Sequence, residues 1–211
     1  MKIFKFTALA AVVLASSAIS QNAFAEVSAN IGAVSQYHFR GIQQTAGAST
    51  SAGLDYSEGG FYLGTWAADV ADGLEVDLYG GYGIELDNGL SLGVGATTYQ
   101  YTGDFDSAYN EVNLSAGFGM LSVGYSIGTQ DDEASLEIVE ADYTFLSVTF
   151  EHSGFSATFG SWGDEFDGDY VEAAYGTEIG GFDVGVGVIV SGRDLDDDEA
   201  LYFSLSKSFD L

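Results

Sequence analysis

The chain contains no cysteine and no proline, and only five of its 211 residues are Lys or Arg. The absence of cysteine excludes disulfide frameworks, thiol chemistry and zinc sites built on cysteine. The scarcity of basic residues, against 32 Asp and Glu, excludes a nucleic-acid-binding surface, which needs positive charge to neutralise phosphates. The chain is nonetheless 46% hydrophobic, and this content excludes a disordered acidic protein.

The first 25 residues differ from the rest of the chain. A basic start at Lys2 and Lys5 is followed by an apolar run from Thr7 to Ile19 and by small residues up to Ala25, an order typical of a cleaved secretory signal peptide. The alternative is a membrane anchor, but this apolar run is shorter than the roughly 20 residues of a spanning helix. We therefore divide the chain into a signal peptide at 1–25 and a mature domain at 26–211.

The mature domain alternates apolar and polar residues with a period of two, the pattern of β-strands with one apolar face. It contains no apolar run long enough for a membrane helix, so if it enters a membrane it does so as strands. The apolar phase changes inside one predicted strand, 136–151, which predicts a bulge there or two separate pieces. The twelve predicted strands are 27–40, 48–56, 61–68, 74–85, 90–101, 110–118, 121–128, 136–151, 155–162, 169–178, 182–191 and 199–211.

Two kinds of connection alternate along the chain. Short turns such as Asp87–Asn88–Gly89 follow the even-numbered strands, and longer polar loops, nearly all acidic, follow the odd-numbered ones. Consecutive antiparallel strands would place all the short turns at one end of the sheet and all the loops at the other. We call these the turn end and the loop end.

The composition of the polar face decides between two kinds of barrel. A soluble barrel would bury the apolar face, but its surface should then be about a quarter to a third charged. Many polar positions here are small instead, which suits a concave lumen. The sequence therefore predicts a transmembrane antiparallel up-and-down β-barrel of about 12 strands, closed because an open edge in lipid would leave backbone groups unpaired. The small positions are Ser91, Gly93, Gly95, Thr97, Ser122, Gly124, Ser126, Gly128, Gly185 and Gly187.

The predicted apolar face should contact lipid. We expect Val94, Leu114, Val123 and Val186 to point outward near the middle of the membrane. Aromatic residues near the strand ends predict two girdles at the bilayer interfaces. Those near the loop end are Tyr37, Phe39, Tyr99 and Tyr101, and those near the turn end are Tyr56, Phe61, Phe118, Phe155, Phe182 and Phe209.

Residues 35–45 carry a resemblance to a known family, and the C-terminal strand resembles a general feature of outer-membrane barrels. The segment SQYHFRGIQQT contains a Tyr-x-Phe-Arg-Gly core followed by Gln-Thr, and it resembles the first-strand signature of the TorF family of porins. The similarity continues through GLDY at 53–56 and EVDLYGGY at 75–82. The final strand alternates to the end of the chain, and Phe209 lies two residues before the last residue, Leu211. This strand looks like the C-terminal signal that the barrel-assembly machinery recognises. The resemblance implies a barrel in the outer membrane and a porin role.

The number of strands leaves open whether the lumen conducts. Barrels of about eight strands are filled by side chains and those of sixteen leave an aqueous channel, so twelve lies between. Small inward residues favour a narrow water-filled pore for small hydrophilic solutes or ions; in the alternative, Trp66, Tyr79, Trp162 and Tyr202 fill the space. Inward carboxylates predict a preference for cations. The residues predicted to line the pore are His38, Arg40, Glu75, Asp77, Glu111 and Asp183.

Arg40 is the inward base that we place within a predicted strand, and it has two possible roles. It could form a constriction that faces the acids, or an ion-paired lock that stabilises the loop end, because an unpaired buried Arg is too costly. Catalysis is disfavoured, since the neighbours His152 and Ser153 would point to opposite faces of a strand. We predict no enzyme activity, no metal site and no cofactor.

The expected partners are outer-membrane lipids and small solutes, and the sequence leaves the oligomeric state open. A non-conducting scaffold or surface-interaction barrel remains the alternative function.

Overall fold

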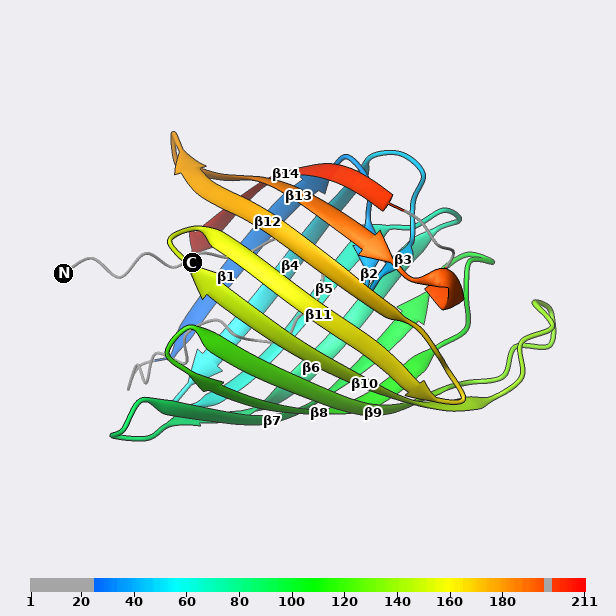
Figure 1. Cartoon of the computed structure of the whole chain (residues 1–211), viewed down its shortest axis with the longest axis horizontal. Helices are drawn as coiled ribbons and strands as arrows, with labels where there is room; N and C mark the ends of the chain where they lie inside the picture. The colour runs from blue at the N-terminus through cyan, green and yellow to red at the C-terminus, as the bar shows by residue number, and fades with distance from the viewer. Residues whose placement is uncertain (1–24, 196–198) are drawn as a thin grey trace.

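The computed structural model describes residues 25–195 and 199–211. The predicted signal peptide, apart from Ala25, and residues 196–198 of the last acidic loop lie outside this range, and their roles stay predictions. The described chain forms a closed barrel of twelve antiparallel strands (Figure 1), which confirms the predicted fold class. Among the described residues, no helix is long and apolar enough to cross a membrane.

Each barrel strand pairs with its neighbours along the chain, and the first pairs with the last. β1 meets β14 in a ladder that runs from Ser28 opposite Asp210 to Val34 opposite Ser204. The barrel strands are β1 (Glu26–Val34), β4 (Ser49–Glu58), β5 (Phe61–Asp69), β6 (Leu74–Glu85), β7 (Leu90–Tyr101), β8 (Tyr109–Phe118), β9 (Leu121–Gln130), β10 (Ala141–His152), β11 (Phe155–Asp164), β12 (Asp169–Ile179), β13 (Phe182–Ser191) and β14 (Glu199–Asp210). A separate hairpin of β2 (His38–Phe39) and β3 (Ile42–Gln43) lies between β1 and β4, and a short 3-10 helix, η1 (Arg193–Leu195), precedes β14.

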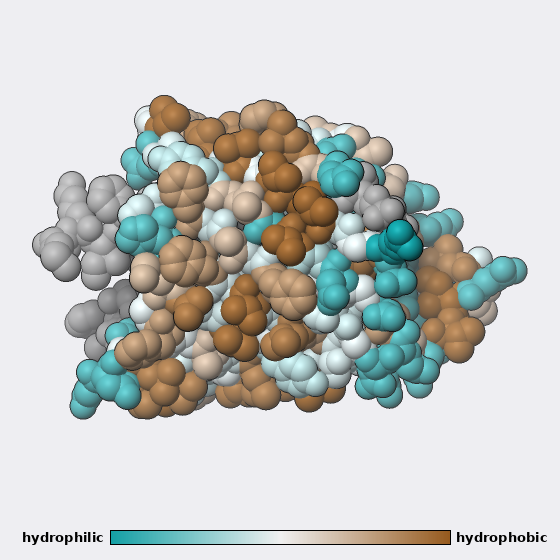
Figure 2. Space-filling model, in the orientation of Figure 1, coloured by the Kyte–Doolittle hydropathy of each residue, from teal (hydrophilic) through white to brown (hydrophobic). Residues whose placement is uncertain are grey.

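The alternation predicted from the sequence sets the two faces of the barrel wall. Val94, Leu114, Val123 and Val186 all point outward and are exposed, as predicted. Figure 2 shows that hydrophobic side chains dominate the middle of the visible wall, whereas hydrophilic ones gather toward the loop end. The exterior is thus the apolar face of the sheet, and the polar face lines the lumen.

Two predicted strand boundaries are wrong. The first strand ends at Val34 instead of continuing to Arg40, because the chain turns away from the wall there. The eighth predicted strand begins at Ala141, and its ladders to β9 and β11 continue without a bulge. Its apolar phase changes because Tyr143 and Phe145 face the interior whereas the apolar residues after them face outward.

The two predicted aromatic girdles have different outcomes. At the turn end, Phe61, Phe118 and Phe155 are among the most exposed side chains of the barrel, as expected for an outer girdle. At the loop end the prediction is wrong, because Tyr37 and Tyr99 are buried inside the barrel. Their hydroxyl groups hydrogen-bond to lumen carboxylates, so these aromatics belong to the interior.

Leu114 and Ser115 are neighbours on β8 that point to opposite sides of the wall, and they offer a matched test. Leu114→Arg should destabilise the membrane-inserted barrel by about 2–4 kcal/mol, because it places a charge on the face expected to meet lipid. Ser115→Arg should be tolerated, because Ser115 faces the lumen and is nevertheless solvent-exposed. Folding into lipid vesicles, followed by urea titration, measures both. Equal destabilisation by the two variants would contradict the assignment of the faces.

Candidate functional site in the barrel lumen

The connection between β1 and β4, residues 35–48, folds into the barrel, and we call it the latch. Its two short strands pair His38 with Gln43 and Phe39 with Ile42. The two residues at the tip, Arg40 and Gly41, both have positive φ, +48° and +89°, as a two-residue hairpin turn requires. A side chain at position 41 would come within 3 Å of Tyr170 and Leu195, so the close approach of the tip to the wall requires glycine.

Arg40 at the latch tip forms a buried ion pair with Glu111 of β8. Its two terminal nitrogens each donate a hydrogen bond of 2.8 Å to a different oxygen of the Glu111 carboxylate. One of them, Nη2, also donates to Ser126 Oγ at 3.2 Å. Arg40 and Glu111 are only 2% and 4% exposed, so solvent does not screen their attraction.

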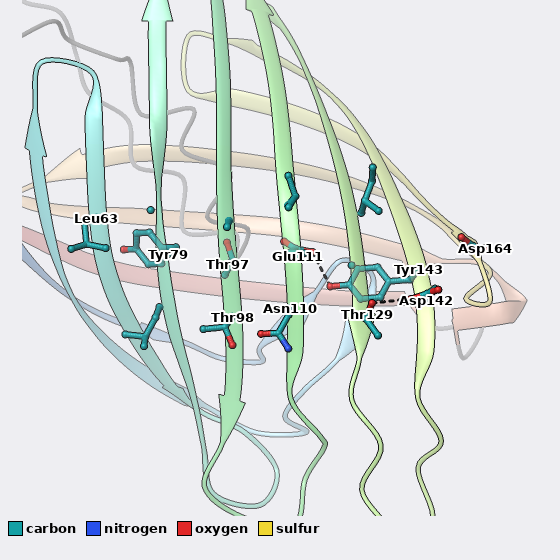
Figure 3. Close-up of a pocket in the computed structure, with 16 residues that line it drawn as sticks. Leu63, Tyr79, Thr97, Thr98, Asn110, Glu111, Thr129, Asp142, Tyr143 and Asp164 are labelled. Carbon is teal, nitrogen blue, oxygen red and sulfur yellow. Dashed lines mark hydrogen bonds between the residues drawn. The ribbon is translucent and has the colours of Figure 1, made fainter.

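Further donors and aromatic rings complete the environment of this pair. Glu111 also accepts hydrogen bonds from the hydroxyl groups of Tyr99 and Tyr143 and from the amide of Asn113, at 2.7–2.9 Å; Figure 3 shows the bond from Tyr143. The Arg40 guanidinium lies 4.3 Å from the ring centroid of Phe145. A buried ion pair is favourable only when its remaining polar atoms are satisfied, and the carboxylate meets this condition.

Other contacts fix the backbone of the latch to the wall. Trp162 Nε1 donates to the carbonyl oxygen of Arg40 at 3.0 Å, and Ser191 Oγ donates to that of Gly41 at 2.5 Å. Nearer β1, the Tyr37 hydroxyl donates to Glu75 Oε1 at 2.6 Å. Burial, together with the nearby Glu75, raises the pKa of Tyr37 well above its usual value, so this hydroxyl remains a proton donor. The latch is therefore held to several strands of the barrel.

The latch and the wall together form a hydrophobic cluster at the loop end of the lumen. The rings of Tyr143 and Phe166 stack 5.3 Å apart, and Phe39 and Ile42 of the latch pack against the cluster. Its buried members are Tyr143, Phe145, Trp162, Tyr170, Ile189, Leu195 and Ala200. The lumen is thus packed with side chains at its loop end.

Several inward glycines make room for tyrosines of neighbouring strands. A Cβ atom at Gly128 would collide with the ring of Tyr143, and one at Gly187 would collide with the ring of Tyr202. At the turn end, Gly95 faces the hydroxyl of Tyr62 in the same way. Some of the small positions predicted to leave open space therefore accommodate aromatic rings, and the lumen is narrower than its glycine content suggested.

The structure brings together some of the predicted site residues and separates others. Glu75 and Asp77 project from β6 into the lumen and are buried, and Glu111 lies close enough to pair with Arg40. His38 and Arg40 lie on the latch, not on a barrel strand, which corrects their expected location. Asp183 lies apart at the turn end of β13, opposite Ser206. Whether these residues line a conducting path stays a prediction.

Of the two roles considered for Arg40, its contacts are those of an ion-paired lock. Sequence reasoning placed Ser126 and Trp162 in the interior but did not link them to Arg40, and it did not assign Phe145 or Ser191 to the latch. The signals of an aromatic cluster inside the barrel were the change of apolar phase at Tyr143 and Phe145 and the alternative in which Trp162 fills the lumen.

A shallow pocket of about 760 Å³ lies against β5–β11 (Figure 3). Outward-facing residues such as Leu63, Leu78 and Val112 supply much of its lining, with polar side chains toward the loop end. One pair of these, Thr129 and Asp142, is hydrogen-bonded at 2.8 Å. No group of three or more His, Asp or Glu among residues 25–195 and 199–211 is placed to hold a metal ion.

A family profile of bacterial sequences covers most of the chain. A sequence profile of a bacterial family of unknown function, Gcw_chp, matches residues 18–194. No curated protein matches the chain in sequence. The resemblance to the TorF family therefore stays a prediction.

Solved structures of similar fold include membrane-protein barrels at low sequence identity. One, described as "Unveiling the Mechanism Behind the in-meso Crystallization of Membrane Proteins", has a TM-score of 0.64 at 9% identity, over 88% of this chain and 84% of the other. The KdgM porin has a TM-score of 0.57 at 8% identity, over 86% and 98%. The KdgM porin in complex with disordered oligogalacturonate gives 0.56 at 8% identity, over the same shares. At these identities the likeness concerns the fold alone.

The contribution of the ion pair to stability can be measured with a double-mutant cycle. Arg40→Met should destabilise the folded barrel by about 3–5 kcal/mol, because it leaves the Glu111 carboxylate buried without a counter-charge. Arg40→Met combined with Glu111→Leu should recover much of this loss. Arg193→Met, at an exposed position, is the control and should change little. Urea unfolding in detergent micelles gives the values, and equal effects of Arg40→Met and Arg193→Met would refute the lock.

Proposed function

The chain belongs to the Gcw_chp family, whose function is unknown, and we propose that this member is an outer-membrane porin with a narrow, cation-preferring channel. The proposal depends on the arrangement of side chains on the barrel wall. Apolar side chains face outward all around a closed barrel, and polar and acidic side chains face inward, which is the reverse of a soluble barrel. Such a barrel satisfies its backbone hydrogen bonds internally and presents an apolar surface to lipid.

The lumen has two parts with different properties. Toward the turn end, small residues such as Ser115 and Gly117 line the wall, and several of these positions are accessible to solvent. Toward the loop end, the latch and the hydrophobic cluster narrow the lumen. The channel is therefore a vestibule that opens at the turn end and is constricted by the latch, and it suits small ions better than large solutes.

The charges in the lumen favour cations. The positive charge of Arg40 is neutralised by Glu111, so it does not offset the other carboxylates. Glu75 and Asp77 lie on the same face of β6, where in their ionised forms they raise the local concentration of cations and repel anions. Oligogalacturonate, the ligand in a KdgM complex, is a polyanion and suits this lumen poorly. The expected solutes therefore differ from that ligand in the sign of their charge.

A second function, a non-conducting scaffold in the outer membrane, is favoured by one observation. The aromatic cluster and the latch fill the loop end with side chains that are almost completely buried. A barrel closed in this way could present its acidic loops without conducting. Electrical recording separates the two functions, since only a channel passes current.

Ion selectivity gives the direct test. In planar bilayers with a potassium chloride gradient, the reversal potential should show a preference for potassium, which a Glu75→Gln/Asp77→Asn variant should reduce by roughly twofold or more. Glu111 is retained in this variant because it pairs with Arg40. Asp87→Asn, in an exposed turn, is the control and should leave selectivity unchanged.

The other outcomes of this recording are equally informative. A preference for chloride would contradict the proposed selectivity. The absence of current from correctly inserted protein would reject the porin function in favour of the scaffold. The preference for potassium should weaken as salt rises but keep its sign, because screening shortens the reach of the lumen charges to about 10 Å at 0.1 M.

A further inference from the structure

Asp77 is a buried carboxyl group that has no ion-pair partner among the described residues. Asp77 is only 3% exposed, and its Oδ1 atom accepts no hydrogen bond from the described part of the chain. The neighbouring carboxylates, in contrast, have partners. Glu111 is paired with Arg40, and Glu75 accepts hydrogen bonds from Tyr37 and Tyr101. Burying a charge without a partner is costly, so the Asp77 carboxyl group is most stable in its neutral, protonated form when no cation is near. A positive group beside it would stabilise the ionised form, so this oxygen marks a place where a cation could bind with loss of the proton.

Aromatic residues surround Asp77 on the inner face of the barrel. In the strand register Asp77 is opposite Trp66 of β5 on one side and Tyr99 of β7 on the other. Tyr79 follows two residues along the same face of β6 and is also buried. Tyr37 of the latch contacts Trp66 edge to face, with ring centroids 5.8 Å apart. A carboxylate is therefore walled by four aromatic residues from three strands and the latch.

The chemistry of these residues selects one class of cation. Divalent metal ions need several oxygen or nitrogen ligands, and the described residues form no group of three or more His, Asp or Glu that could hold one. Aromatic rings with a carboxylate instead suit alkylated ammonium groups, which combine a positive charge with an apolar surface.

We propose that Asp77, Trp66, Tyr79, Tyr99 and the latch residue Tyr37 form a binding site for small organic ammonium ions. This proposal rests on the proposed function and names the class of cation that its lumen selects. Tyr37, Tyr79 and Tyr99 are buried, so the site is closed in this conformation. The latch forms its roof, and its displacement lets a ligand reach Asp77. The hydrogen bond from Tyr37 to Glu75 is one of the contacts that must then break.

Calorimetric titration of the purified, folded full-length mature barrel in detergent micelles tests the proposal. The probe is tetramethylammonium chloride, with potassium chloride and the neutral, similarly shaped tert-butanol as comparisons. The wild-type protein should bind tetramethylammonium at least about tenfold more tightly than either, because only this probe offers both charge and apolar surface.

Two variants locate the site, and one serves as a control. Asp77→Asn keeps the size of the side chain but removes its charge, and it should weaken tetramethylammonium binding about tenfold or more. Trp66→Leu removes one aromatic wall without changing the charge, and it should also weaken binding. Glu151→Gln alters an exposed carboxylate at the far end of β10 and should leave the affinity within twofold.

The results separate the binding site from the channel. Undetectable binding to wild-type protein, or equal affinities of the wild type and Asp77→Asn, would overturn the site even if the barrel conducts potassium. Binding that is lost in Asp77→Asn and retained in Glu151→Gln supports the site even if no current is recorded, in which case only the porin function fails. Equal affinities for tetramethylammonium and potassium would contradict the proposal that the aromatic rings select alkylated ammonium ions.

Discussion

The buried ion pair between Arg40 and Glu111 is the interaction on which the interior of this barrel depends. It joins a loop to the wall across 71 residues of sequence, and it places a guanidinium group where water cannot solvate it. Such a pair requires partners for its remaining polar atoms, and Tyr99, Tyr143, Asn113 and Ser126 supply them for the carboxylate and the terminal nitrogens. Arg40 Nε has no hydrogen-bond partner among the described residues. The position of the latch, the closure of the loop end and the balance of charge in the lumen all follow from this arrangement.

The pair also determines which charges remain available for function. Because Arg40 is committed to Glu111, the carboxylates of Glu75 and Asp77 are not balanced by it. The same latch brings Tyr37 over β6, so that aromatic rings meet these carboxylates. The stability of the latch and the proposed preference of the lumen for cations therefore have a common origin, and a change in one should alter the other.

The wall of the barrel could be predicted from the sequence because a period of two reports directly on the two faces of a sheet. The alternation in β7, β8 and β13 correctly indicates which residues point outward. The latch could not be predicted in this way, because Tyr37 and Phe39 continue the alternation beyond Val34. Arg40 was recognisable as the rare inward base, but its partner Glu111 is distant in sequence and was one of several candidate acids. Trp162 was among the side chains that could fill the lumen, but its hydrogen bond to the latch and that of Ser191 could not be predicted, because both depend on a backbone that only the fold brings to them.

Replacing the latch tests its control of the lumen most directly. Val34 and Ser49 are paired in the ladder between β1 and β4, so a short Gly-Ser turn can join these strands in place of residues 36–47. Single-channel recording should then show a conductance several-fold above that of the wild type, whereas replacing residues 132–139 by a similar Gly-Ser turn should leave conductance unchanged. A latch-free barrel that is correctly inserted and conducts no more than the wild type would contradict the account.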